Sequence, residues 1–157
     1  MERFVIQGGI PLKGTVVPSG NKNAALPILA ATLLSSKPIT LHNLPNIGDV
    51  RTMLQLLEDL GASVERHDDH SVTVHAADIR STCPDPKLFS EIRGSMTLLG
   101  PMLARAGRIT LTLPGGDRIG RRRIDTHLLA LGALGAEVRL DDGFEMKADA
   151  LRGADIW

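Results

Sequence analysis

The fold is decided by residues 22–75, which read KNAALPILAATLLSSKPITLHNLPNIGDVRTMLQLLEDLGASVERHDDHSVTVH. The apolar stretch Ala24–Leu34 predicts a helix, and Ile39–Leu41 predicts a short strand after it. A second helix is expected over about Val50–Leu60, because apolar residues recur there at helical spacing and Gly61 follows as a left-handed cap. The rest predicts a β-hairpin, with a strand around Val64, a polar turn at His67–His70 and a strand at Val72–Val74.

The two predicted helices differ in how they should be buried. The second helix carries a single apolar stripe, which suits a helix lying on a sheet. The first helix, Ala24–Leu34, is apolar nearly all round. A helix of that kind is expected to be covered on every side, so it should lie in the interior of the molecule.

Residues 91–148 repeat the same order of elements. The repeat comprises a helix at Ser95–Ala106, a strand at Ile109–Leu113, a helix at about Asp125–Leu134, and a hairpin whose strands flank Asp141-Asp142-Gly143. A Pro-rich and Asp-rich linker, residues 76–90, joins the two copies. Short strands with helices packed between them predict an α+β protein with small mixed sheets. The predicted units are residues 22–80 and 81–150, and residues 151–157 read as the start of a third unit that is cut short.

Composition narrows the class of function. The 157 residues are 43% hydrophobic and 23% charged, so a packed core is expected. Basic and acidic residues balance at zero net charge, which argues against binding to nucleic acid or a membrane surface. The N-terminus lacks a secretory pattern, which favours a cytoplasmic protein. Cys83 is the only cysteine, so neither an internal disulfide nor a cysteine-cluster metal site is expected.

The first candidate site lies directly before the first helix, at Ser19–Ala25. Small and amide residues suit a helix N-cap, whose N–H groups carry a partial positive charge. Lys22 at that end makes a suitable site for a phosphate or a carboxylate. The alternative is that Lys22 is a solvated residue on an ordinary cap.

The second candidate site is the loop Pro114–His127, PGGDRIGRRRIDTH. Its glycines allow the backbone to approach a ligand closely, and its consecutive arginines match phosphate and carboxylate oxygens. Asp117 could hold an arginine, or could donate a proton if its pKa were raised. The alternative is a solvated basic turn before a helix. By contrast, His67–His70 matches no common zinc spacing and is expected to be a polar turn, with no metal.

Together these motifs resemble one family. The residues Gly20-Asn21-Lys22-Asn23-Ala24-Ala25-Leu26-Pro27-Ile28-Leu29, Ile92-Arg93-Gly94-Ser95, Leu113-Pro114-Gly115-Gly116, Ile119-Gly120-x-Arg122 and Asp125-x-His127 are similar to segments of UDP-N-acetylglucosamine 1-carboxyvinyltransferases. The resemblance covers essentially the whole chain. It implies an incomplete enolpyruvyl transferase fold, an inside-out α/β barrel of repeated helix–strand–helix–hairpin units. It also implies that residues 1–21 form a strand and lead-in belonging with a second domain.

The resemblance implies a function too. Members transfer the enolpyruvyl group of phosphoenolpyruvate to the 3-hydroxyl of UDP-N-acetylglucosamine, the first committed step of peptidoglycan synthesis, with no metal or other cofactor. The implied catalytic residues are Asp117, as proton donor, and Lys22. The residues implied to bind phosphoenolpyruvate or its anionic groups are Lys22, Asn23, Arg93 and Arg122. The residues implied to bind UDP-N-acetylglucosamine are Asn23, Arg93, Arg122, Arg123, Ile124, Asp125, Thr126 and His127.

Two positions depart from the usual pattern of the family. Asp117 stands where many members carry a reactive cysteine, which resembles the aspartate variant of the family. A carboxyl group cannot form the thioether through which fosfomycin inactivates cysteine members, so insensitivity to fosfomycin is expected. Arg123 stands where proline is common in the family, and without proline the direction of the chain is less fixed there. The resemblance therefore implies nucleotide contacts of Arg123 and Ile124 less directly than that of Arg122.

Two other functions stay open at this point. The sister enzyme that makes 5-enolpyruvylshikimate 3-phosphate uses the same repeated unit and the same donor. The second possibility is a non-catalytic folding or ligand-binding module. Because the general base and further cations are expected in the second domain, the isolated chain is expected to show no turnover.

Overall fold

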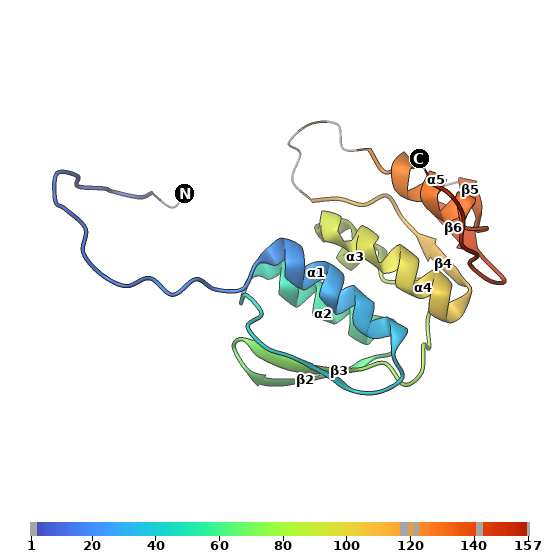
Figure 1. The fold of residues 1–157 in the computed structure, drawn as a ribbon, viewed down its shortest axis with the longest axis horizontal. Coiled ribbons are helices and arrows are strands. Elements are labelled where there is room, and N and C mark those ends of the chain that lie inside the picture. The colour runs from blue at the N-terminus through green and yellow to red at the C-terminus, as the bar shows by residue number, and fades with distance from the viewer. Residues whose placement is uncertain (1–2, 117–119, 121–122, 141–142, 157) are drawn as a thin grey trace.

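The computed structural model describes residues 3–116, 120, 123–140 and 143–156. Two α+β units follow one another, as the sequence predicts (Figure 1). Each carries a small sheet that is purely antiparallel, so the prediction of mixed sheets was wrong. The first unit comprises α1 (Lys22–Ala31), the 3-10 helix η1 (Thr32–Leu34), β1 (Ile39–Leu41), α2 (Gly48–Asp59), β2 (Ser63–Asp68) and β3 (Ser71–His75). The second unit comprises α3 (Pro86–Glu91), the 3-10 helix η2 (Arg93–Leu98), α4 (Leu99–Ala106), β4 (Arg108–Leu111), α5 (Asp125–Ala133), β5 (Glu137–Leu140) and β6 (Phe144–Lys147).

The two sheets have the same topology. The first sheet has the order β1-β3-β2 and the second has the order β4-β6-β5, with all strands antiparallel. In each sheet the last strand of the unit lies in the middle, between the strand that precedes the second helix and the first strand of the hairpin. This shared strand order confirms the internal repeat at the level of topology.

The helices α1 and α2 pack together beside the first sheet, and α4 packs on η1, which continues α1 (Figure 1). Along α2, Met53, Leu56 and Leu57 are completely buried, which confirms the predicted apolar stripe. Leu29 and Leu33 bury the facing side of the first helix and of its 3-10 extension. Burial of such side chains is the dominant favourable term in folding.

Both units close their second helix in the same way. Gly61 and Gly135 have positive φ angles of 111° and 100°, where a residue with a Cβ atom is strained. After α2, the Ala62 N–H donates to the carbonyl of Leu57; after α5, the Ala136 N–H donates to the carbonyl of Leu131. This is the hydrogen bond of a Schellman cap, so the predicted glycine caps are confirmed.

Three predictions about the elements were wrong in detail. The first helix is not covered on every side: Ala25 and Leu26 are buried, whereas Ile28 is 48% exposed, because α2 and η2 pack on the side that carries Ala25 and Leu26. The predicted helix Ser95–Ala106 is divided into η2 and α4; Pro101 has no N–H to donate to residue 97, which interrupts the α-helical ladder. The predicted strand Ile109–Leu113 ends at Leu111.

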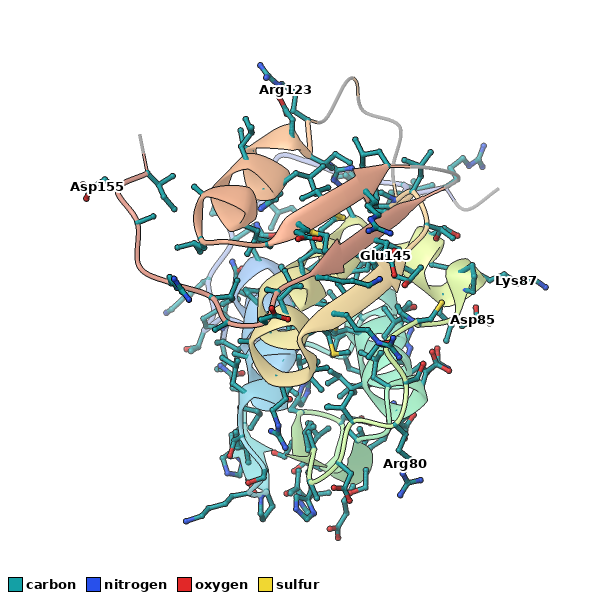
Figure 2. The ribbon with its side chains drawn as sticks, turned by 90° about the vertical axis from the view of Figure 1, so that its right-hand side faces the viewer. Arg80, Asp85, Lys87, Arg123, Glu145 and Asp155 are labelled. Carbon is teal, nitrogen blue, oxygen red and sulfur yellow. The ribbon has the colours of Figure 1, made fainter. Side chains whose placement is uncertain are left out.

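One helix was not predicted at all. The linker contains α3, whose N-cap is Asp85, with its carboxylate accepting from the N–H groups of Lys87 and Leu88. Pro86 occupies the first helical position, where its fixed φ angle suits a helix start. Figure 2 shows Lys87 pointing outward from this helix. The Phe89 side chain is fully buried, so α3 belongs to the core.

Arg105, near the end of α4, joins the two units through backbone carbonyls. Its guanidinium donates to the carbonyl oxygen atoms of Leu33 at 3.0 Å, Ala76 at 3.0 Å and Ala77 at 2.9 Å. These acceptors lie in η1 and in the linker after β3. A single side chain of the second unit therefore satisfies acceptors from two separate segments of the first unit.

The two ends of the chain differ in how they contact the body of the molecule. Residues 3–21 form no helix or strand and extend away from the body of the molecule (Figure 1). Residues 151–156 also form no element, although Arg152 donates its N–H to the carbonyl of Leu134. The assignment of these two segments to a second domain and to a third unit stays a prediction. Across the described ranges, none of the helices has the length and apolar character needed to cross a bilayer.

Candidate functional site

The first candidate site is built at the start of α1. The Asn21 side chain caps this helix by accepting from the N–H groups of Asn23 at 2.8 Å and Ala24 at 3.2 Å. Lys22 follows as the first helical residue, and its Nζ lies 2.8 Å from Oδ2 of Asp49. The side chains of Lys22 and Asp49 are 46% and 34% exposed, so a ligand can reach both.

Tight packing brings Arg93 toward this end of α1. An added Cβ on Gly94 would lie 2.4 Å from Cδ1 of Leu26, so the start of η2 rests directly on α1. Leu26 is one helical turn from Lys22 and on the same helix face. The structure therefore places Lys22 and Arg93 in the same region of the molecule.

The glycine-rich loop begins against the end of α3 and the start of η2. An added Cβ on Gly115 would lie 1.6 Å from the carbonyl oxygen of Ser90, and one on Gly116 would lie 2.9 Å from the backbone nitrogen of Arg93. No larger residue fits this approach without movement of the backbone. The two glycines are therefore needed for packing, in addition to any approach to a ligand.

The far end of this loop returns to Arg93. Nη2 of Arg93 donates to the carbonyl oxygen of Arg123 at 3.0 Å. Arg93, which is half-buried, thus contacts the loop just before α5 and, through its own backbone, the loop's start at Gly116. The loop is held at both ends by the segment that carries this arginine.

Arg123 and Asp125 form an exposed ion pair at the start of α5. Nε of Arg123 donates to both carboxylate oxygens of Asp125 at 3.0 Å, and Nη2 contacts Oδ2. This hydrogen bonding lowers the pKa of Asp125 and raises the pKa of Arg123 from their ordinary values. Figure 2 shows Arg123 at the edge of the molecule, pointing away from its body. Arg123 and Asp125 therefore bind each other here, which the sequence did not indicate.

The remaining predicted residues divide into two groups. Asn23, Thr126 and His127 are exposed, and Ile124 is half-buried, at the starts of α1 and α5. Asp117 and Arg122 lie outside the described residues, so their predicted roles stay predictions.

Sequence reasoning missed Asp49. Its signal was present, because an aspartate in the first turn of a helix favours the positive end of the helix dipole. That signal gives no partner, however, and the contact with Lys22 depends on how α1 packs beside α2. Within the part of the chain described, no group of three His, Cys, Asp or Glu residues could hold a metal ion.

The arrangement suits an anionic ligand. An ammonium group at a helix start and a guanidinium from a neighbouring element lie in one region, and the loop contacts the residue that carries the guanidinium. Fixed cations and helix N–H groups are the usual partners of phosphates and carboxylates. The geometry therefore favours a small, multiply charged anion as the ligand.

Curated relatives cover the chain from end to end. The chain is 48% identical over 155 residues to the UDP-N-acetylglucosamine 1-carboxyvinyltransferase of Bradyrhizobium diazoefficiens, with 99% of this chain and 36% of that protein covered. It is 46% identical over 157 residues to the enzyme of the same name from Treponema denticola, with 100% and 37% covered. The chain thus spans a little over a third of the length of these relatives.

Solved structures give the same fold. The enolpyruvyl transferase NikO from Streptomyces tendae matches with a TM-score of 0.77 and 26% identity, covering 92% of this chain and 32% of that one. An EPSP synthase from Acinetobacter baumannii matches with a TM-score of 0.62 and 16% identity, covering 87% of this chain and 32% of that one, which shows the fold alone. The family model described as EPSP synthase (3-phosphoshikimate 1-carboxyvinyltransferase) matches residues 6–156. Since that match takes in nearly the whole sequence, the chain belongs to this family of enolpyruvyl transferases.

Proposed function

We propose that the protein carrying this chain transfers the enolpyruvyl group from phosphoenolpyruvate to the 3-hydroxyl of UDP-N-acetylglucosamine and releases phosphate. The observation that carries this proposal is the identity of 48% and 46% to relatives that bear the name UDP-N-acetylglucosamine 1-carboxyvinyltransferase. The reaction is the first committed step of peptidoglycan synthesis, so the protein acts in the cytoplasm and supports cell-wall formation, cell shape and division.

The proposed roles of the residues follow the chemistry of the two substrates. Phosphoenolpyruvate brings a phosphate and a carboxylate beside a nucleotide diphosphate, which requires several fixed cations. Lys22, Arg93 and Arg122 supply them, and Asn23 helps to hold the sugar. Residues 122–127 bind the uridine nucleotide. The convergence of Lys22, Arg93 and the glycine-rich loop supports this assignment.

Asp117 is the proposed proton donor. Protonation of the methylene carbon of phosphoenolpyruvate creates an oxocarbenium-like centre, which the sugar hydroxyl then attacks with loss of its proton. Departure of phosphate and loss of a proton from the new methyl group restore the double bond of the transferred enolpyruvyl group. The general base and further cations come from outside this chain in the proposal, and closure of two domains on the substrates excludes water. The scheme needs no metal and no other cofactor.

The proposal is tested by measuring phosphate release from phosphoenolpyruvate with the full-length protein. We expect release with UDP-N-acetylglucosamine and none with shikimate 3-phosphate; the reverse result would assign the protein to the sister reaction named by the family model. The 157-residue chain alone is expected to give no release, because it spans little more than a third of its relatives. Its turnover would contradict the proposed second domain.

The same assay tests the proposed aspartate chemistry. Fosfomycin is expected to leave the activity unchanged, since the carboxyl group of Asp117 cannot form a thioether. Asp117→Cys in the same protein is the matched variant, and it is expected to become sensitive to irreversible inactivation. Rapid irreversible loss of activity in the unchanged protein would refute the role assigned to Asp117.

A further inference from the structure

The ion pair between Lys22 and Asp49 joins the starts of two neighbouring helices. Lys22 is the first residue of α1, Asp49 lies in the first turn of α2, and their charged atoms are 2.8 Å apart. The backbones beside them are also in contact, since a Cβ on Gly20 would lie 1.8 Å from the carbonyl oxygen of Asn43. The two helix starts are therefore fixed relative to each other.

The helix dipoles act on the two side chains in opposite directions. The positive end of α1 disfavours the ammonium group of Lys22, whereas the positive end of α2 favours the carboxylate of Asp49. The first turn of α1 contains no acidic residue that could compensate. The position of the Lys22 ammonium therefore depends on a carboxylate that belongs to a different helix.

A carboxylate beside an anion-binding lysine has two opposing effects. It repels an incoming anion, and it orders the flexible side chain that binds this anion. Both side chains are partly exposed, at 46% and 34%, so water and salt screen the repulsion. The loss of rotamer freedom in a lysine is not screened, and an ordered lysine no longer bears this loss when the ligand binds. Removal of the Asp49 charge distinguishes the two effects, because they change the affinity for an anion in opposite directions.

We propose that Asp49 is a positioning residue, which holds the ammonium group of Lys22 ready at the start of α1 for the phosphate or carboxylate of phosphoenolpyruvate. This inference rests on the proposed function for the identity of the ligand. The contact itself does not depend on that function. Asp49 acts through Lys22 and is assigned no contact with substrate.

The contact is tested first, without any substrate, in the 157-residue chain. Peptide mapping measures the rate at which an acylating reagent modifies Lys22, with the exposed Lys37 and Lys87 as internal references. Asp49→Asn is expected to raise the rate at Lys22 about threefold, as befits the loss of an exposed ion pair. Glu58→Gln removes the same charge from the exposed side of α2 and should leave the rate unchanged. An unchanged rate in Asp49→Asn overturns the proposal.

The role is tested next in the full-length protein. Asp49→Asn is expected to raise the KM for phosphoenolpyruvate about threefold to fivefold while changing kcat less, since the lost ordering acts on binding. Asp49→Glu should recover most of the affinity. A merely structural defect would instead change kcat and KM together, and Asp49→Glu would not rescue it. Tighter binding in Asp49→Asn would mean that repulsion dominates, and it overturns the proposal. If the unchanged protein does not bind phosphoenolpyruvate, the proposed function and the ligand assigned here both fail, although the acylation result still reports the contact.

Discussion

The two units share one order of elements but differ in the connection between the first strand and the second helix. In the first unit this connection is residues 42–47, and the Leu44 N–H pins it to the carbonyl of His70 in the hairpin. In the second unit it is residues 112–124, which contain the glycines and arginines of the candidate site. The same architecture therefore carries a short structural turn in one copy and a long loop with candidate site residues in the other.

The helices that follow these connections differ as well. Most apolar residues of α2 are buried, whereas none of the residues of α5 is buried, and Leu129 is 70% exposed. A short helix gains most of its stability from packing of an apolar face. The helix α2 is therefore anchored in the core, whereas α5, which follows the long connection, is anchored more weakly.

The largest expected effect comes from the same substitution at equivalent positions of α2 and α5. Leu57 and Leu131 accept the same capping hydrogen bond in the two units, but Leu57 is completely buried and Leu131 is only half-buried. Leu57→Ala should lower the free energy of unfolding by about 3 kcal/mol, because it leaves a cavity in the core. Leu131→Ala should cost about 1 kcal/mol, as measured by urea unfolding followed by circular dichroism. Equal losses would show that the two helices are anchored equally.

A smaller effect tests the start of the long loop. Gly115→Ala should lower the free energy of unfolding by about 2 kcal/mol, because its Cβ would overlap the carbonyl oxygen of Ser90. Gly132→Ala is the matched variant in α5, where an added Cβ meets nothing within 4 Å. It should stabilise the protein by roughly 0.5–1 kcal/mol, since alanine favours a helix. Thermal unfolding of both variants distinguishes a close backbone approach from a general need for glycine.

The smallest effect concerns the ion pair at the start of α5. Arg123→Gln should move the pKa of Asp125 upward toward its ordinary value of 3.8, because the hydrogen bonds from the guanidinium are lost. A lowered pKa stabilises the folded protein above the ordinary value, and this contribution fades as the pH falls through the folded pKa. The stabilities of the two proteins should therefore converge at low pH. Carboxyl NMR titration measures the shift.

Arg80→Gln is the control for that titration. Figure 2 shows Arg80 and Arg123 at opposite ends of the molecule. The pKa of Asp125 should be unchanged in Arg80→Gln. A similar upward shift in both variants would mean that the general field of the protein, rather than the contact with Arg123, controls the Asp125 carboxyl group.

The order of elements could be predicted from the sequence because its signals are local. The apolar stripe before Leu60 and the glycine at 61 specify the end of α2 within a few residues, and Gly135 repeats this signal. The helix α3 carried an equally local signal in Asp85 and Pro86, but its six residues are too short for an apolar period to emerge.

The contacts of the candidate site could not be predicted in the same way. The distance between Lys22 and Asp49 is set by the packing of α1 against α2, across 27 residues of chain. The pairing of Arg123 with Asp125 is local. The resemblance to the family nevertheless assigned both residues to nucleotide binding, so their contact with each other was not predicted. The exposed side of α1 near Ile28 was also unpredictable, because an apolar surface in a sequence does not say what covers it.

The guanidinium of Arg105 has a consequence for how this duplicated chain comes apart. Its hydrogen bond to Leu33 spans 72 positions, so the end of α4 cannot separate without losing hydrogen bonds to three carbonyl groups, those of Leu33, Ala76 and Ala77. In repeat proteins, individual repeats often unfold one at a time. Here the guanidinium of Arg105 links the two units. They should therefore unfold together, in a single sigmoidal transition.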